Sequence, residues 1–147
     1  MQSPEESRAI ELFRSGYNCA QAVVSSFSET MDFDIDQAAA LSAGFGGGMG
    51  RLQKTCGAVT GAFMVLGIYN YRKYSEPTER KNRASDMVRE FNHRFGSIYG
   101  TTDCSSLIEC DISTEEGRRI AKETGLFEKI CEPCIADAVK IVLEMTK

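Results

Sequence analysis

The segment from Cys56 to Tyr69 contains no charged residue, and it constrains the fold of this chain more than any other stretch. A helix here would be apolar on every face, which is typical of a buried central helix. The segment is too short and too rich in glycine to span a membrane. Gly57 and Gly61 lie four residues apart on one helical face, so a neighbouring backbone can approach closely there. The sequence therefore predicts a core built around this helix.

Cys56 stands at the start of the predicted helix, directly after Thr55. If Thr55 is the N-cap, Cys56 is the first helical residue. The first turn of a helix carries unpaired N–H groups and a partial positive charge, and both favour a thiolate. Burial in an apolar pocket would act in the opposite direction on the pKa. We therefore expect a lowered pKa at Cys56 unless its sulfur is sealed off from water.

The composition is that of an ordinary globular protein. With 147 residues, 42% hydrophobic and 26% charged, the chain has the size of one domain spanning 1–147. A net charge of -4 without a basic stripe argues against a nucleic-acid partner. The N-terminal residues do not resemble a signal peptide, so we expect a cytoplasmic protein without a membrane partner. In that reducing compartment the six cysteines would serve redox or metal chemistry rather than disulfide bridges.

Three other cysteines follow helix-start signals. Asn18 and Gln21 form a capping-box pattern that makes Cys19 the first helical residue. Thr102 or Asp103 is suited to cap a short helix that begins near Cys104 and ends near Cys110. Cys131 enters the last helix, whose first turn is marked by Pro133. Four independent core cysteines have no reason to prefer helix starts, so we expect the four to converge on one site.

The rest of the chain also reads as helical, because no stretch alternates with the two-residue period of a strand. We predict an all-α, single-domain helical bundle with a buried central helix. The remaining predicted helices run from Ser3 to about Ser15, from Asn18 to about Met31, from about Asp36 to Ala43, from Pro77 to about Phe95 where Gly96 ends it, and from Ser113 to about Gly125. His93, the single histidine, is expected on a solvated face. The glycine cluster of 44–50 is expected to border the cysteine site.

At these residues the chain resembles the C_GCAxxG_C_C family of redox-active proteins. The resemblance rests on four segments in order: GYNCAQAV at 16–23, GFGGGMGRLQKTCGAVTGA at 44–62, TTDCSSLI at 101–108 and CEPCIADAV at 131–139. It implies a small helical protein with a redox role for four family cysteines, which are Cys19, Cys56, Cys104 and Cys131. The chain departs from the family pattern in the order Cys56-Gly57-Ala58 and in having Cys110 and Cys134 as additional cysteines. The haem attachment motif Cys-x-x-Cys-His is absent.

Three functions remain open at the level of sequence. The first is thiol–disulfide exchange, in which Cys56 or Cys19 attacks, another family cysteine resolves, and the partner is a redox protein or a small thiol. The second is a metal site in which Cys19, Cys56, Cys104 and Cys131 hold an iron–sulfur cluster or zinc. The third is a helical interaction protein whose cysteines are core residues. The apolar central helix is compatible with a monomer or a homo-oligomer.

Overall fold

The computed structural model describes residues 2–147, and over that range the fold is all-α with eight α-helices and no strand. The predicted fold class is confirmed. The helices are α1 (Pro4–Arg14), α2 (Cys19–Ser26), α3 (Ile35–Ser42), α4 (Gly57–Lys73), α5 (Pro77–Tyr99), α6 (Cys104–Ile108), α7 (Glu115–Glu123) and α8 (Glu132–Met145). A 3₁₀ turn, Ala43–Phe45, follows α3, and a π-helical turn, Phe127–Cys131, precedes α8.

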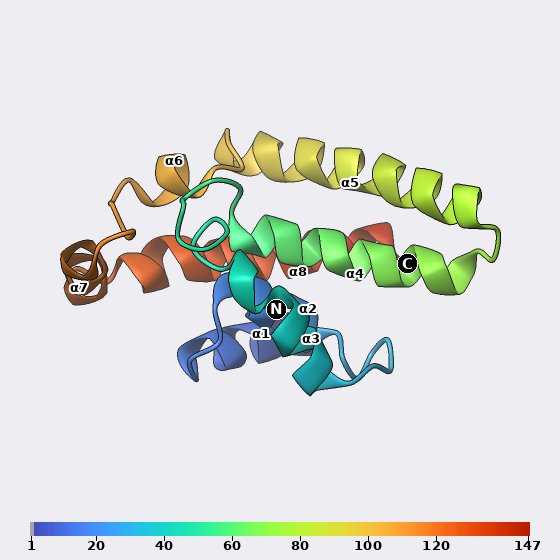
Figure 1. The fold of residues 1–147 in the computed structure, drawn as a ribbon, viewed down its shortest axis with the longest axis horizontal. Helices are drawn as coiled ribbons and strands as arrows, with labels where there is room; N and C mark the ends of the chain where they lie inside the picture. Colours follow the sequence, from blue (N-terminus) through green and yellow to red (C-terminus); the bar gives the residue numbers. More distant parts are fainter. Residues whose placement is uncertain (1) are drawn as a thin grey trace.

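Helix α4 is the central element, as predicted, and it contacts α2, α5 and α8. In Figure 1, α4 and α8 run through the middle, α5 covers one side and α1 to α3 lie on the other. The helix continues to Lys73, beyond the predicted end at Tyr69. One face is less buried than we predicted, because Phe63, Met64 and Ile68 remain partly exposed. Within residues 2–147, none of the helices combines the length and hydropathy needed to cross a membrane.

The two glycines of α4 allow α2 to pack closely across it, as the sequence predicts. A Cβ atom at Gly57 would lie 3.0 Å from the backbone nitrogen of Ala20. One at Gly61 would lie 2.9 Å from the carbonyl oxygen of Ala20 and 3.1 Å from Cβ of Val23. Backbone atoms cannot move aside as a flexible side chain can. Side chains at these two positions would therefore separate α2 from α4.

Gly61→Val is expected to destabilise the protein by about 2 kcal/mol or more, because overpacking forces backbone shifts of that cost. Gly67→Val is a matched control in the same helix, since a Cβ at Gly67 would meet no atom within 4 Å. We expect the control to change the free energy of unfolding by less than about 0.5 kcal/mol. Urea unfolding followed by circular dichroism measures both. Equal effects of the two substitutions would contradict the close packing of α2 on α4.

Several helix ends differ from the sequence prediction for identifiable reasons. Helix α2 ends at Ser26, before the predicted Met31, and irregular turns lead on to α3. Helix α5 runs past Gly96 and ends at Tyr99, where the C-cap Gly100 adopts the left-handed conformation with φ 77°. Helix α6 ends at Ile108 rather than near Cys110, because Glu109 turns left-handed. The early end of α6 leaves Cys110 in a loop.

Candidate functional site

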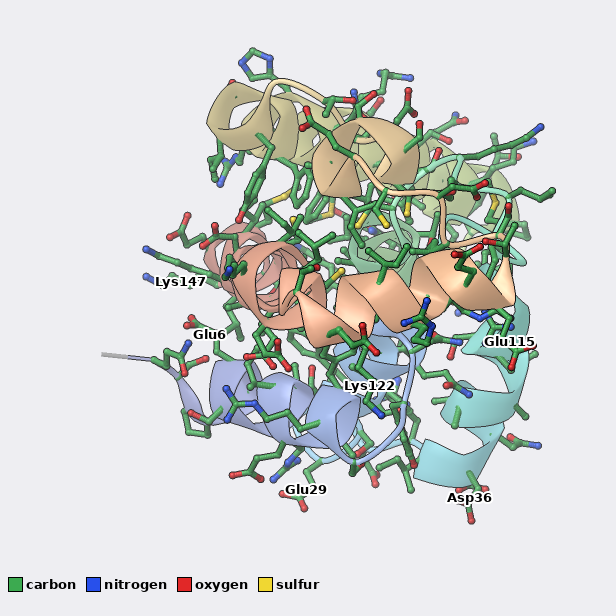
Figure 2. The ribbon with its side chains drawn as sticks, turned by 90° about the vertical axis from the view of Figure 1, so that its left-hand side faces the viewer. Glu6, Glu29, Asp36, Glu115, Lys122 and Lys147 are labelled. Atoms are coloured by element: carbon green, nitrogen blue, oxygen red, sulfur yellow. The ribbon has the colours of Figure 1, made fainter. Side chains whose placement is uncertain are left out.

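Five of the six cysteines line one cavity of about 410 Å³ at one end of the bundle. They are Cys19, Cys56, Cys104, Cys131 and Cys134. Figure 2 views this end of the molecule, and several sulfur atoms gather in the interior between α6 and α8. The expected convergence of the four family cysteines is confirmed. Cys134, which the sequence analysis treated as additional, joins them, whereas Cys110 does not line the cavity.

Cys19 and Cys104 are first residues of their helices, as predicted. Cys19 opens α2, where the side chain of Asn18 accepts from the Gln21 N–H and the Gln21 side chain accepts from the Asn18 N–H. Cys104 opens α6, and Asp103 is the N-cap residue. Capping chemistry therefore fixes the start of α2, whereas the Asp103 side chain makes no capping hydrogen bond at the start of α6.

Cys56 lies one residue earlier than predicted, because it is the N-cap of α4 and Gly57 is the first helical residue. Its N–H donates to the carbonyl oxygen of Thr102 at 2.7 Å, while the Cys104 N–H donates to the carbonyl oxygen of Lys54 at 2.6 Å. Thr55 does not cap the helix as expected. It forms an isolated antiparallel bridge with Asp103, and this short pairing holds Cys56 beside Cys104.

Cys131 directly precedes α8, as predicted, but the chain is already helical there, because a π-helical turn runs over Phe127–Cys131. The turn before Pro133 is π-helical, and the Glu132 N–H donates to the carbonyl oxygen of Phe127. Proline lacks an N–H and clashes with the carbonyl four residues earlier, which a wider turn relieves. Cys131 therefore has no free helix start beside it. It lies one turn before Cys134, and both residues reach the cavity.

The glycine segment forms one wall of the cavity, as expected. Gly47, Gly48 and Gly50 have φ angles of 63°, 69° and 62°, in the left-handed region that favours glycine. A Cβ at Gly48 would lie 2.6 Å from the backbone of Gln53, so this loop cannot fold with a side chain there. Gly46 packs equally closely against the Asn18 side chain. The loop is thus fixed in shape next to α2 and α4.

Gln53 joins this loop to the segment that contains Cys110 and Ile112. Its Nε2 donates to the carbonyl oxygen of Cys110 at 2.7 Å, and its Oε1 accepts from the Ile112 N–H at 3.1 Å. Ile112 lines the cavity. On the far side, Arg14 of α1 holds Glu132 through two hydrogen bonds of 2.8 and 3.0 Å. These contacts fix the loop and the helix entrance around the thiols.

Cys56 is the thiol whose environment favours ionisation. Hydrogen bonding from Cys134 lowers the pKa of Cys56 most, and the backbone N–H groups of Ala58 and Val59 lower it further against the opposing effect of burial. The sulfur forms no hydrogen bond that caps the helix. The donors are nevertheless close enough to stabilise a negative charge when it forms. The expectation for Cys56 as an activated thiol therefore has a physical cause in the structure.

The environments of three other cavity thiols disfavour ionisation. Contact with Cys131 and then burial raise the pKa of Cys19, which disfavours Cys19 as the attacking thiol. Burial raises the pKa of Cys104 to about 12. Contact with Cys56 and burial raise the pKa of Cys134. The pKa of Cys56 is therefore lowered while those of these three thiols are raised, and the contacts pair Cys56 with Cys134 and Cys19 with Cys131.

Tyr99 and Asp137 extend this cluster, and the sequence analysis missed both. The Tyr99 hydroxyl donates to Oδ2 of Asp137 at 2.6 Å, and it also contacts the Cys134 thiol. Burial and this hydrogen bond raise the pKa of Tyr99. Asp137 follows Cys134 by three residues on the same face of α8, which is the sequence signal that could have pointed to it.

All six cysteines are free thiols in the structure. Over residues 2–147, no three His, Cys, Asp or Glu side chains are arranged to hold a metal ion. The thiols as placed would have to move to bind a cluster or zinc, so the residues do not fit a metal in this arrangement. His93, the single histidine, is exposed on α5 as expected. The geometry instead offers closely spaced thiols that can exchange disulfide bonds.

Comparison with known proteins identifies a family for the chain. Neither the curated proteins nor the solved structures contain a match to the chain. One family model matches residues 17–145, which include all five cavity cysteines. Its description is "Putative redox-active protein (C_GCAxxG_C_C)". The chain therefore belongs to the C_GCAxxG_C_C family of redox-active proteins.

Proposed function

We propose that this protein carries out thiol–disulfide exchange with Cys56 as the attacking thiolate. The observation that carries the proposal is the position of Cys56 in a cavity with four other thiols, facing the N–H groups at the start of α4. A thiolate is the nucleophile in disulfide exchange, and a positive helix end favours it. Cys19 drops out as the attacking residue because its neighbours favour the protonated form.

Cys134 is the resolving thiol in this proposal. Its contact with Cys56 allows it to attack a mixed disulfide on Cys56 and release the bound partner. Cys19 and Cys131 form a second contacting pair in the same cavity. That pair can receive the disulfide from the first, with Cys104 lying close to both Cys56 and Cys131. The four family cysteines and Cys134 thus act as one set of exchanging thiols.

Mapping the first disulfide that forms tests the proposal. Reduced protein treated with one equivalent of diamide and then alkylated should contain a Cys56–Cys134 disulfide when its peptides are analysed by mass spectrometry. Cys110 should be recovered alkylated, because it lies outside the cavity. A Cys110→Ser variant is the matched control and should give the same disulfide.

Two outcomes would contradict the exchange mechanism. Disulfides distributed at random over the six cysteines would mean that the cavity does not direct exchange. Stoichiometric iron or zinc in anaerobically purified protein, with thiols protected from diamide, would favour the metal-binding alternative.

A further inference from the structure

The walls of the cysteine cavity carry positive charge only. Arg51 and Arg118 are its charged lining residues, although the chain has 21 acidic residues and a net charge of -4. Within residues 2–147, neither guanidinium lies within 4.0 Å of a carboxylate, whereas Arg119, the neighbour of Arg118, pairs with Glu116 and Glu123. A cavity lined by one sign of charge attracts ligands of the other sign.

The two arginines come to the cavity from separate segments of the chain. Arg51 is an exposed residue of the glycine loop, with φ 59°. Arg118 belongs to α7, and its Nη1 donates to the carbonyl oxygen of Ile112 at 3.0 Å. That bond fixes the side chain at the cavity wall and leaves its other donors available. Guanidinium groups bind carboxylates in two-pronged geometry, so the pair is suited to an anionic ligand.

Backbone donors add to this positive wall. The N–H groups of Gly47 and Gly48 donate to no protein acceptor in the described part of the chain, residues 2–147. Both residues line the cavity. Successive backbone N–H groups in a turn favour anions without contributing a titratable charge. The loop that needs glycine for its shape therefore also presents donors next to Arg51.

The size of the cavity limits what can reach Cys56. Its volume of about 410 Å³ falls in the lower part of the range of about 300–1,000 Å³ for small-molecule sites. Cys56 is only 7% exposed and Cys134 only 1% exposed. A disulfide on the surface of a folded protein could not approach so deeply placed a sulfur. A small molecule could enter through the open side.

We propose that the oxidant of this site is a small disulfide that carries carboxylates near its S–S bond. This rests on the thiol-exchange function proposed above. The Cys56 thiolate attacks one sulfur of RS–SR, forms Cys56–S–S–R and releases RS⁻ toward the arginines. Cys134 then attacks the Cys56 sulfur and forms the Cys56–Cys134 disulfide. The second R group leaves as RSH with the Cys134 proton, so two electrons pass from the two protein sulfurs to the small disulfide.

Two small disulfides of opposite charge test the proposal: glutathione disulfide, which is anionic, and cystamine, which is cationic. We compare the second-order rate constants for oxidation of the reduced protein. Arg51→Gln/Arg118→Gln is expected to lower the ratio of the anionic to the cationic rate constant by about tenfold or more. Arg119→Gln is the control, because Arg119 does not line the cavity, and it should leave the ratio unchanged.

The wild-type protein provides a second measurement that does not depend on any variant. Its rate with glutathione disulfide should fall as salt rises from about 0.02 to 0.5 M, while its rate with cystamine should rise, because salt screens the arginines. Equal rates and equal salt dependence for both disulfides would overturn the anionic preference alone. If Cys56 of the wild-type protein, shown to be folded by circular dichroism, exchanges with neither disulfide, the exchange function itself fails.

Discussion

Cys56→Ser is expected to slow the reaction of the cavity with small disulfides at pH 7 by about hundredfold or more. The reason is that the cavity thiols differ in how readily they ionise at pH 7. A thiol of ordinary pKa is only a few per cent thiolate at pH 7, and burial raises the pKa of Cys104 to about 12, which leaves far less. The pKa values of Cys19 and Cys134 are also raised. Loss of Cys56 therefore removes the nucleophile, and the raised pKa values of Cys19, Cys104 and Cys134 keep these three thiols from replacing it.

The measurement is the stopped-flow rate of thiol oxidation, with Cys110→Ser as the matched control. Cys110 lies outside the cavity and its sulfur contacts the Gly117 carbonyl oxygen at 3.5 Å. We expect the control to react at the wild-type rate. Limiting iodoacetamide near pH 6.5 should likewise label Cys56 before Cys110 or Cys134. A Cys56→Ser variant that keeps the wild-type rate would remove Cys56 from the mechanism.

Much of the site could be predicted from sequence because capping chemistry is local. Asn18 and Gln21 determine the start of α2 from four consecutive residues, and this placed Cys19 correctly. The absence of charge after Cys56 marked the central helix, and Gly57 with Gly61 marked where α2 crosses it. Convergence followed from the repeated placement of cysteines at helix starts rather than from any one of them.

Other parts of the site depend on contacts between distant segments. Thr55 pairs with Asp103, 48 residues later (103−55), and this pairing shifts the start of α4 by one residue. Sequence patterns contain no signal for that bridge. Arg51 and Arg118 likewise meet at the cavity only because the glycine loop and α7 fold against the same end of the bundle.

In the last helix, Pro133 indicated the first turn of a helix but not the helical turn that precedes it. Pro133 is typical of a first helical turn, so the sequence favoured a helix start next to Cys131. The structure accommodates the proline with a π-helical turn instead, and the helix passes through. Cys134 also lies four residues before Ala138, on the buried face of α8. That spacing could have placed Cys134 in the core, where it contacts Cys56.

Raising the pH from 8 to 10 is expected to destabilise the reduced protein through its buried thiols. The ordinary pKa of 9.0 applies to Cys104 in the unfolded chain, whereas burial raises it to about 12 in the folded protein. A group with a raised folded pKa contributes its full stability below the unfolded value and loses it as pH rises toward the folded value. The loss for Cys104 therefore begins near pH 9. Cys19 and Cys134 act in the same direction, while the lowered pKa of Cys56 acts in the opposite one.

Comparison of the wild-type protein with Cys104→Ala isolates the contribution of Cys104. At pH 10, ionisation of Cys104 in the unfolded chain lowers the free energy of unfolding by about 1.4 kcal/mol. We expect about 1 kcal/mol of this loss to remain after solvent screening. Urea unfolding with a reductant at pH 8 and pH 10 gives the loss of stability for each protein. The wild-type loss should exceed that of Cys104→Ala by this amount. The comparison within each variant removes the separate cost of the side chain deleted from the core. Equal losses in the two proteins would mean that Cys104 titrates in the folded state as it does in the unfolded chain, which its burial beside Cys56 and Cys131 argues against.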